Sequence, residues 1–546
     1  MKKKLLGLFL TIATTLSLAG CGSADSGSGL ALDAQAAGNS DPTQAAAAAS
    51  DDDTLVFAGA GFDTQNFNPV FSMTMLNKYV LDAVYDGLTY TDENGNVAGA
   101  IAESFEESAD HLTYSFKIRQ GVTFQNGDAL TADDVSYSYD RYMQDDAING
   151  ATLTNYVESF EQPDQYSFVV HLKKVYPFFL SSISGIRILP KAYIEANGEE
   201  YFNDHPIGTG VYQVTEIVPD TSVTLTAVEN HWRDNPEYKK IIVRNIPEAS
   251  TQLALLKTGE VDIASLNFDN LAELESFPNI SVKNLAKTTM TAILVQGAWE
   301  NTGEAVQNED VRRALDLAIN REDIVNAFFD GYAAPEKYWK ASEIGEHWDP
   351  NWKATEYDPE KAKELLDKAG YPGAFEKPTV RLYVASGDFR AQLAELIASY
   401  WQAVGVQVEL HQLDETLEMQ LLRGNGQELT EEGVGAVFLH SSPCGLNNGL
   451  LAKEIFYTTT GRCSIIRDDV SVDEIYQKGL EADTLEERNK YDLQLMTKVD
   501  DELKYSFGVA YIDQLWGVSP KVGTWLADYG NNQGGFTAIY YKTIKK

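Results

Sequence analysis

The stretch AIAESFEESADHLTYSFKIRQGVTFQNGDALTADDV, residues 100–135, contains the patterns that decide the fold of the first half of this chain. Residues 113–119 alternate apolar and polar side chains, which is the period of a half-buried β-strand. The Asn-Gly-Asp run at 126–128 has the residues of a tight turn, and Thr131 with Asp134 three positions later predicts the capped start of a helix. This stretch is therefore expected to form a mainly β region with short helices.

The remainder of the chain changes from strands to alternating helices and strands after about Asn308. One helix has both ends marked in the sequence, because Asp358 is an N-cap, Pro359 suits the first helical position and Gly370 follows the last turn. The second half is therefore expected to carry an α/β domain. Further strands are predicted at 54–58, 166–172, 223–228, 241–246, 261–264, 380–384 and 406–410, and further helices at 253–257, 311–319 and up to residue 400.

The composition allows two or three domains, since the 546 residues are 44% hydrophobic and 11% aromatic. The 81 acidic and 43 basic residues give a formal net charge of -38. Such a charge repels phosphate backbones and anionic lipid, so nucleic acid is excluded as a partner. A well-solvated surface explains this charge, and an attraction for cationic ligands is the alternative.

The N-terminus has the pattern of an export signal. Lys2 to Lys4 precede a mostly apolar stretch at 5–18, and Leu-Ala-Gly-Cys follows at 18–21. This end resembles the lipobox of bacterial lipoproteins, which implies a signal peptide at 1–20 and an acylated, palmitate-bearing Cys21. Residues 21–53 are then a lipidated cysteine and a flexible tether, since Gly, Ser, Ala, Asp and Gln dominate them. The lipid is expected to be the only membrane attachment, and a plain signal peptide is the alternative.

Two further cysteines, Cys444 and Cys463, could close a loop of about 20 residues in an oxidising compartment. A disulfide there contributes roughly 3 kcal/mol in the chain-entropy model. His440 lies four positions before Cys444, so a soft metal site from these three residues is the alternative to a disulfide. The spacing matches no zinc motif, and both alternatives stay open.

No catalytic motif is present in the sequence. It contains no HExxH, GxSxG, CxxC or Walker phosphate loop. The run 208–210, Gly-Thr-Gly, begins like a dinucleotide fingerprint, but Gln213 stands where the third glycine belongs, so a turn between domains is predicted there. The chain is therefore expected to be no enzyme and to need no metal or cofactor, although paired carboxylates of a glycan-active enzyme remain an alternative.

The segments 100–106, 113–122 and 130–135 together resemble the signature region of the bacterial family 5 extracellular solute-binding proteins, which are the oligopeptide, dipeptide and nickel binders. The resemblance covers roughly Thr54 to Lys521. Six further blocks agree in order, at 206–212, 230–232, 256–262, 310–315, 318–321 and 357–370.

The resemblance implies an α/β fold with two lobes, of the periplasmic-binding-protein type (type II, cluster C), with a hinge of crossing strands and an extra mainly β domain. A solute enclosed between the lobes then stabilises the closed form, which a permease recognises. The implied domains are domain I in lobe one at 54–87, 206–290 and 510–546, domain II as an insertion in lobe one at 88–205, and domain III as lobe two at 291–509.

The ligand-binding pattern departs from the family at one place. Peptide-binding members carry an aspartate in the second lobe, in a run after an aromatic residue, that pairs with the α-ammonium group of the peptide. The corresponding run here, residues 437–447, begins with Val-Phe-Leu and contains no acid. A buried ammonium without a paired charge costs several kcal/mol, so a free peptide N-terminus is not expected to bind in the usual way. Another carboxylate, a blocked peptide, a glycan or a metal chelate are the alternatives.

Nine residues are candidates for ligand contact because of their position relative to the crossing strands. Trp401, by contrast, precedes Gly405 on a predicted helix and is assigned to the core. The nine candidates are Phe62 and Asn66 in the first loop, Gln296 and Trp299 near the first crossing, His440, Ser441 and Ser442 in the altered run, and Tyr511 and Trp516 near the return.

The sequence therefore predicts the monomeric substrate-binding component of an ABC importer that captures a peptide-like solute. Its partners are the permease and ATPase subunits, and it lies outside the cytoplasm, anchored to the outer face of the cell membrane. Capture of an oligosaccharide or metal chelate is the main alternative. A secreted glycan-active enzyme and a sensory receptor are the others.

Overall fold

The computed structural model describes residues 52–59, 61, 67–71, 75–91, 97–144, 150–339, 352–386, 389–424, 429–443, 449–482, 484–525 and 544–545. The predicted signal peptide, Cys21 and nearly all of the tether lie outside these residues. Within the described part, no helix is both long and apolar enough to cross a membrane.

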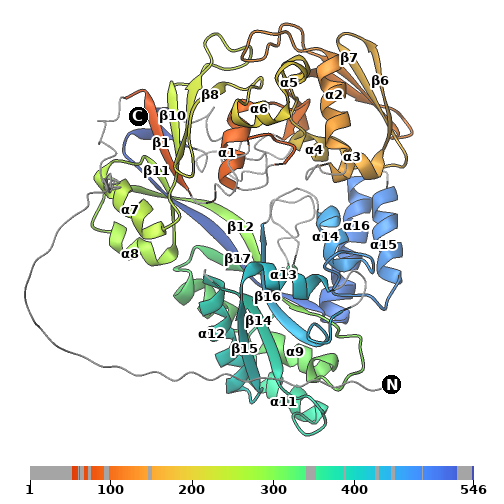
Figure 1. The fold of residues 1–546 in the computed structure, drawn as a ribbon. Helices are drawn as coiled ribbons and strands as arrows, with labels where there is room; N and C mark the ends of the chain where they lie inside the picture. The colour runs from red at the N-terminus through yellow and green to blue at the C-terminus, as the bar shows by residue number, and fades with distance from the viewer. Residues whose placement is uncertain are drawn as a thin grey trace, which may run out of the picture. The chain divides into compact units, whose positions relative to one another are not determined.

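One large sheet of eleven strands organises the structure (Figure 1). Strands from the first half of the chain form one side of it, strands from the second half form the other, and β12 and β17 connect the two sides. A short strand, β13 (Ala333–Pro335), pairs with β17 outside this path. The order is β15 (Val408–Leu413), β14 (Val380–Ala385), β16 (Ala436–Pro443), β12 (Ser281–Val295), β17 (Ser506–Val518), β11 (Ile263–Leu266), β1 (Thr54–Gly59), β10 (Lys240–Asn245), β9 (Ser222–Ala227) and β8 (Tyr212–Val218).

The two central strands β12 and β17 form an antiparallel ladder that is interrupted near its middle. Leu285 pairs with Gln514 and Thr289 with Ile512, so three residues of β12 lie opposite one residue of β17. Extra residues of this kind leave backbone groups out of the ladder and bend the strand. The ladder is regular toward the first-half strands, and toward β16 it has a second, smaller register shift between Thr291 and Ala292. The bulge at 286–288 is the larger interruption and the place where we expect the sheet to bend most easily.

The far end of β17 is fastened to the first-half strands by a buried carboxylate. Asp262 accepts a hydrogen bond from the backbone N–H of Val56 at 2.9 Å and one from Ser519 Oγ at 3.1 Å. Lys521 Nζ lies 3.4 Å from the same carboxylate and also donates to the carbonyl oxygen of Thr54. One acid therefore holds the start of β1, the segment before β11 and the end of β17 together.

The predicted mainly β region is a four-stranded antiparallel sheet covered by a helix. Its order is β4 (Ala102–Glu107), β5 (Thr113–Ile118), β7 (Ser167–Leu172) and β6 (Val157–Asp164). Tyr114, Phe116 and Ile118 are buried while the residues between them are exposed, as the alternation predicts. The helix α2 (Ala132–Tyr142) packs Tyr139 against Phe168, with ring centroids 5.2 Å apart. Thr131 and Asp134 form the predicted capping box.

The second half has the predicted alternation of helices and strands. In α11 (Pro359–Ala369), Asp358 Oδ1 accepts from the backbone N–H of Lys361 at 2.9 Å, and Gly370 has a φ of +73°, so both predicted ends are confirmed. Trp401 in α12 (Phe389–Ala403) is fully buried, and its indole N–H donates to the Leu315 carbonyl oxygen at 2.9 Å, which confirms its place in the core. Other helices here are α9 (Glu309–Leu317), α10 (Arg321–Asp323), α13 (Glu415–Arg423), α14 (Gly449–Tyr457), α15 (Ser471–Glu481) and α16 (Leu485–Met496), and the first half has α1 (Met75–Val84), α3 (Ala151–Tyr156), α4 (Phe179–Ser182), α5 (Lys191–Asn197), α6 (Glu199–Asp204), α7 (Ala249–Thr258) and α8 (Leu271–Leu274).

The Gly-Thr-Gly run at 208–210 packs against the C-terminal end of α1. A Cβ on Gly210 would overlap the carbonyl oxygen of Ala83. The hydroxyl of Thr209 donates to buried Asp86 at 3.0 Å, and Asp86 also pairs with Arg233 at 2.9 Å. The two glycines therefore serve close approach of two backbones, which fits the predicted turn.

We predict that Gly210→Ala lowers the free energy of unfolding by about 1–3 kcal/mol, because the backbone of α1 has to move to admit the methyl group. Gly185→Ala is the matched control, since nothing lies within 4 Å of a Cβ at that position. It is expected to change stability by no more than about 0.5 kcal/mol. Urea unfolding followed by circular dichroism measures both, and equal effects of the two substitutions would contradict this packing.

Candidate functional site

Four of the predicted ligand-contact residues come together where β12, β16 and β17 lie side by side. Met290 pairs with Ser442 on one side and with Tyr511 on the other. The next residues along β12 pair with Ser441 and His440. All of these positions follow directly after the bulge in β12. The structure thus places His440, Ser441, Ser442 and Tyr511 beside the point where the sheet is free to bend.

In the altered run, residues 437–447, the first serine makes a contact between uncharged polar groups. Ser441 Oγ lies 2.7 Å from Thr291 Oγ1 across the β12–β16 ladder. Its neighbour His440 points to the opposite face of the strand because side chains alternate along a strand. There, His440 Nδ1 lies 3.2 Å from Glu418 Oε1 on α13, and Arg390 on α12 lies 3.7 Å from the other oxygen of Glu418. Sequence reasoning missed both Glu418, the partner of His440, and Arg390, the partner of Glu418.

Three other candidates make structural contacts. Gln296 is fully buried, and its side-chain amide donates to the carbonyl oxygen of Leu422 at 2.7 Å, at the end of α13. Trp299 packs on the core with its ring 6.1 Å from that of Tyr505. Trp516 is 2% exposed and lies between aromatic rings, with Phe57 and Trp525 each at 5.3 Å. These contacts give all three a packing role in this structure.

The remaining predicted positions are only partly described. Phe62, Asn66 and Cys444 lie outside the described residues. Cys463 is a buried free thiol, and the disulfide to Cys444 that the sequence allows stays a prediction because its other half lies outside the described residues. Burial raises the pKa of this thiol, while a hydrogen bond from Arg423 opposes that rise. Cys463 is thereby enclosed among core and arginine side chains.

Three arginines hold the start of β17 in the second-half domain. Arg312 donates to the carbonyl oxygen of Leu503 at 2.7 Å, and Arg313 donates to that of Asp501 at 2.7 Å. Arg321 donates to the carbonyl oxygen of Gly508 at 2.8 Å. These arginines belong to the blocks at 310–315 and 318–321, which the sequence singled out without giving them a role. They fasten one end of a strand whose other end is fastened by Asp262.

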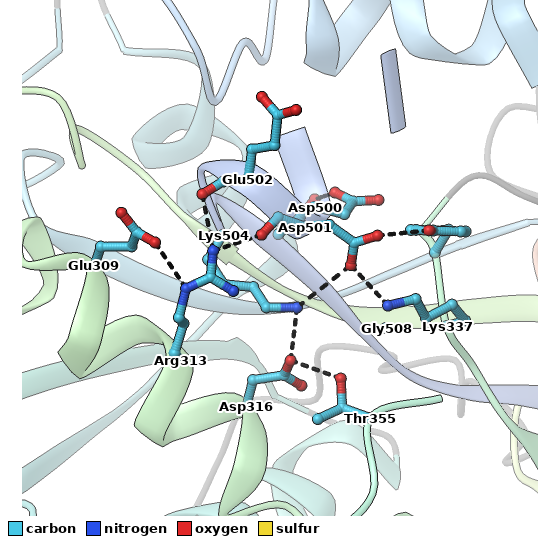
Figure 2. Close-up of polar contacts among 12 residues, drawn as sticks. Glu309, Arg313, Asp316, Lys337, Thr355, Asp500, Asp501, Glu502, Lys504 and Gly508 are labelled. Carbon is cyan, nitrogen blue, oxygen red and sulfur yellow. Dashed lines mark hydrogen bonds and ion pairs between the residues drawn. The ribbon is translucent and has the colours of Figure 1, made fainter. Parts of the chain in front are cut away.

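Figure 2 shows the ion pairs that accompany this clamp. Lys504 Nζ lies 2.8 Å from Asp316 Oδ2, and Thr355 donates to the same oxygen at 2.8 Å. Asp501 pairs with Lys337 at 2.7 Å. Burial opposes ionisation of Asp316, but Arg321 and Lys504 together hold the pKa of that carboxyl well below its ordinary value. The network therefore keeps its charges paired.

Asp500, next to this network, is a buried acid of a different kind. It is 1% exposed and accepts hydrogen bonds from the hydroxyls of Tyr457, at 2.7 Å, and Ser506. Burial raises the pKa of Asp500 to about 7, although both hydroxyls favour the ionised form. Its neighbour Asp501 differs, since hydrogen bonds from Lys337 and Tyr338 lower the pKa of that carboxyl in spite of its burial.

Within the described ranges, no group of three or more His, Cys, Asp or Glu side chains is arranged to hold a metal ion. The polar groups beside the bulge are an imidazole, hydroxyls, backbone and the half-buried carboxylate of Asp513, which accepts a hydrogen bond from Asn284 Nδ2 at 2.7 Å. Groups of this kind can hold a polar solute by hydrogen bonds, and the strands that carry them also connect the two sides of the sheet. A shared sheet with its site at the crossing strands defines a hinged, two-lobed solute receptor.

The chain belongs to the bacterial extracellular solute-binding proteins of family 5, whose model, described as "family 5 Middle", matches residues 96–441. Members of this family bind solutes outside the cytoplasm. The predicted family is thereby confirmed, and solute binding for import is the function that membership gives.

Known relatives and structures agree with this assignment. The glutathione-binding protein GsiB of Pectobacterium atrosepticum is 28% identical over 386 residues, covering 69% of this chain and 72% of the relative. The structure of NikA from Brucella suis in complex with Fe(III)-EDTA matches with a TM-score of 0.79 at 19% identity, covering 90% of this chain and all of that one. The oligopeptide-binding protein AppA of Bacillus subtilis, in complex with a nonapeptide, matches at 0.71 with 20% identity over 89% and 98% of the two chains. The predicted two-lobed α/β fold is confirmed.

We predict that Asp500→Asn becomes more stable relative to the wild type as pH rises from 5 to 8. The folded wild type holds the Asp500 proton up to a pH of about 7, whereas the unfolded chain releases it near 3.8, so the wild type loses stability across this window. The asparagine carries no charge to bury. The expected relative gain exceeds about 1 kcal/mol.

Urea unfolding at pH 5, 6, 7 and 8 measures this difference. Asp501→Asn is the control, because the lowered pKa of Asp501 leaves that carboxyl ionised throughout the range, so its effect on stability is expected to be constant. A difference between Asp500→Asn and the wild type that does not change with pH would show that Asp500 titrates elsewhere.

Proposed function

We propose that this chain is the substrate-binding component of an ABC importer that captures a peptide-like solute between its lobes and delivers it to a permease. The observation that carries this proposal is the interrupted β12–β17 ladder with the candidate site beside it. A solute that contacts both sides of the crossing favours the closed form by its difference in affinity for the two forms. The permease and its ATPase then recognise the closed form of the occupied protein, and no covalent chemistry is needed.

A peptide-like solute is the first candidate because known relatives bind such molecules. Glutathione, named for the relative GsiB, is itself a peptide, and the AppA structure contains a nonapeptide. A non-peptide solute, either an oligosaccharide or a metal chelate, is the second candidate. It is favoured by the absence of an acid in the run 437–447 and by the chelate in the NikA structure.

The proposal also gives the protein a cellular location and a set of partner subunits. The lipobox-like end at 18–21 favours a lipoprotein with palmitate on Cys21, which is tethered through residues 22–53 to the outer face of the cell membrane. The protein acts as a monomer with the permease and ATPase subunits as partners, and its net charge of -38 disfavours nucleic acid.

The domain limits are also part of the proposal. Domain I comprises residues 54–87, 206–290 and 510–546, domain II comprises 88–205, and domain III comprises 291–509. The pairing of β1 with both β10 and β11, and the separate sheet of β4 to β7, support this division.

Two other classes of function fit less well. A glycan-active enzyme needs a pair of carboxylates in an open site, whereas Asp316, Glu418 and Asp500 near the crossing are buried. The half-buried Asp513 is already hydrogen-bonded to Asn284. A sensory receptor would use the same closure but present it to a signalling partner. We propose transport over sensing because family members are import proteins.

We predict that peptides stabilise the untethered body, Thr54 to Lys546. The probes are two pools of di- to hexapeptides, one with free amino termini and one N-acetylated, tested on protein refolded to remove carried-over solute. A ligand at 100 times its dissociation constant raises the free energy of unfolding by roughly 2.7 kcal/mol, which a thermal shift detects. A pool of free amino acids is the control. If both peptide pools leave the melting temperature unchanged, the solute is not peptide-like and glycans and chelates remain.

We predict that Cys21→Ser releases the protein from the membrane, because no thiol remains at residue 21 to carry the acyl chain. Cell fractionation and labelling with a palmitate analogue measure this in a bacterium that expresses the full chain. Cys463→Ser is the control, since that thiol is buried in the folded body, and it is expected to leave the protein in the membrane fraction. Retention of the Cys21→Ser variant at the membrane would contradict the lipid anchor.

A further inference from the structure

His440 in β16 has a buried carboxylate behind it. Its Nδ1 lies 3.2 Å from Glu418 Oε1, and the rings of Trp339 and Phe456 lie 6.0 and 5.9 Å away. Glu418 itself has 0% of its side chain exposed, whereas His440 has 8% exposed. Of these two groups, only the imidazole has any surface that a solute could contact.

The carboxylate fixes which nitrogen of His440 carries the proton. Glu418 accepts a hydrogen bond, so in the neutral ring Nδ1 is the protonated nitrogen and Nε2 keeps its lone pair. Nε2 makes no hydrogen bond to any residue that the structure describes. A histidine held in this way by a carboxylate presents a basic, oriented electron-pair donor to whatever binds it.

Glu418 does not replace the missing ammonium anchor. Its carboxylate is out of reach of a solute, and Arg390 lies 3.7 Å from it with the opposite charge. The negative charge is thereby offset inside the protein. A solute ammonium at His440 would lose its hydration and find no net negative charge in return, which is costly.

We infer that His440 Nε2 is the contact of the second-half domain with the solute, and that Glu418 is the positioning residue that sets its tautomer. The solute presents to Nε2 an electron-pair acceptor that is not an ammonium group. This inference rests on the proposed function and narrows its ligand class. The acceptor is either an N–H or O–H group, as in a blocked peptide or a glycan, or the open position of a metal complex. Bare metal ions are disfavoured because no described cluster supplies enough further ligands.

The tautomer is tested without any ligand. Long-range nitrogen–proton NMR spectra of histidine-labelled protein distinguish protonated from unprotonated ring nitrogens, and the His440 signals are those that vanish in His440→Gln. The wild type is expected to show a protonated Nδ1 and an unprotonated Nε2. In Glu418→Gln the amide donates to Nδ1, so the two nitrogens are expected to exchange roles. A proton on Nε2 in the wild type overturns the inference.

The solute class is tested by affinity with three probes: the free-amine pool, the N-acetylated pool and a nickel–histidine complex. At least one of the last two is expected to bind at least tenfold more tightly than the free-amine pool. Binding of the N-acetylated pool indicates that Nε2 accepts a hydrogen bond from the solute. Binding of the nickel complex indicates that Nε2 coordinates a metal. His440→Leu is expected to weaken that binding at least tenfold, and His440→Gln, whose amide oxygen still accepts, is expected to recover part of it.

The outcomes separate this inference from the proposed function. If the free-amine pool binds more tightly than the other probes, the peptide receptor stands but the role of His440 is overturned. A His440→Leu variant that folds and binds as the wild type does also overturns the role of His440. If neither peptide pool binds but the nickel complex does, the proposed peptide ligand is wrong and the inference about His440 is supported. If none of the probes binds, the assigned solute class is overturned whatever the tautomer of His440.

Discussion

The fold depends on the pairing of two long strands, β12 and β17, that belong to both sides of one sheet. β12 has one further neighbour, β16, and β17 has two, β11 and the short strand β13, so the mutual ladder of β12 and β17 is the connection between the first-half and second-half strands. Backbone hydrogen bonds resist stretching but allow bending where they are interrupted, and the larger interruption lies at 286–288. The arginines at 312, 313 and 321 fix one end of β17, and Asp262 fixes the other. Bending is thereby concentrated at the bulge, and the candidate site lies directly beside it.

Local patterns in the sequence predicted much of this fold, because the signals involve residues close together in the chain. The alternation at 113–119, the two ends of the helix at 358–370 and the core position of Trp401 are all confirmed. These features depend on side-chain period and on capping groups, which a single segment contains. The family blocks also predicted the two-lobed architecture, although the blocks gave no reason why their arginines are there. The reason is spatial, since Arg312, Arg313 and Arg321 donate to carbonyl oxygens that lie 187–191 residues away in the sequence.

The site was harder to predict, because position along a crossing strand does not say which face a side chain takes. His440, Ser441, Ser442 and Tyr511 lie together beside the bulge, while Gln296 and Trp516, equally near the crossings in sequence, are buried in packing contacts. Glu418 and Arg390 were not predicted, because acids are common in this chain and because the two residues lie 22 and 50 positions before His440 in the sequence. The absence of an acid at 437–447 was visible in the sequence. What replaces it, an imidazole backed by a buried and charge-paired carboxylate, is visible only in three dimensions.

The central claim is that a solute bound beside the bulge closes one lobe on the other. Pulsed electron spin resonance between labels on Lys117→Cys and Lys363→Cys measures the distance between the two proposed lobes, in a Thr54–Lys546 body whose Cys444 is replaced by serine and whose Cys463 is buried. Addition of the peptide pool or nickel complex that raises the melting temperature is predicted to shorten and narrow the distance distribution. A solute that stabilises the protein but leaves that distribution unchanged would contradict the account.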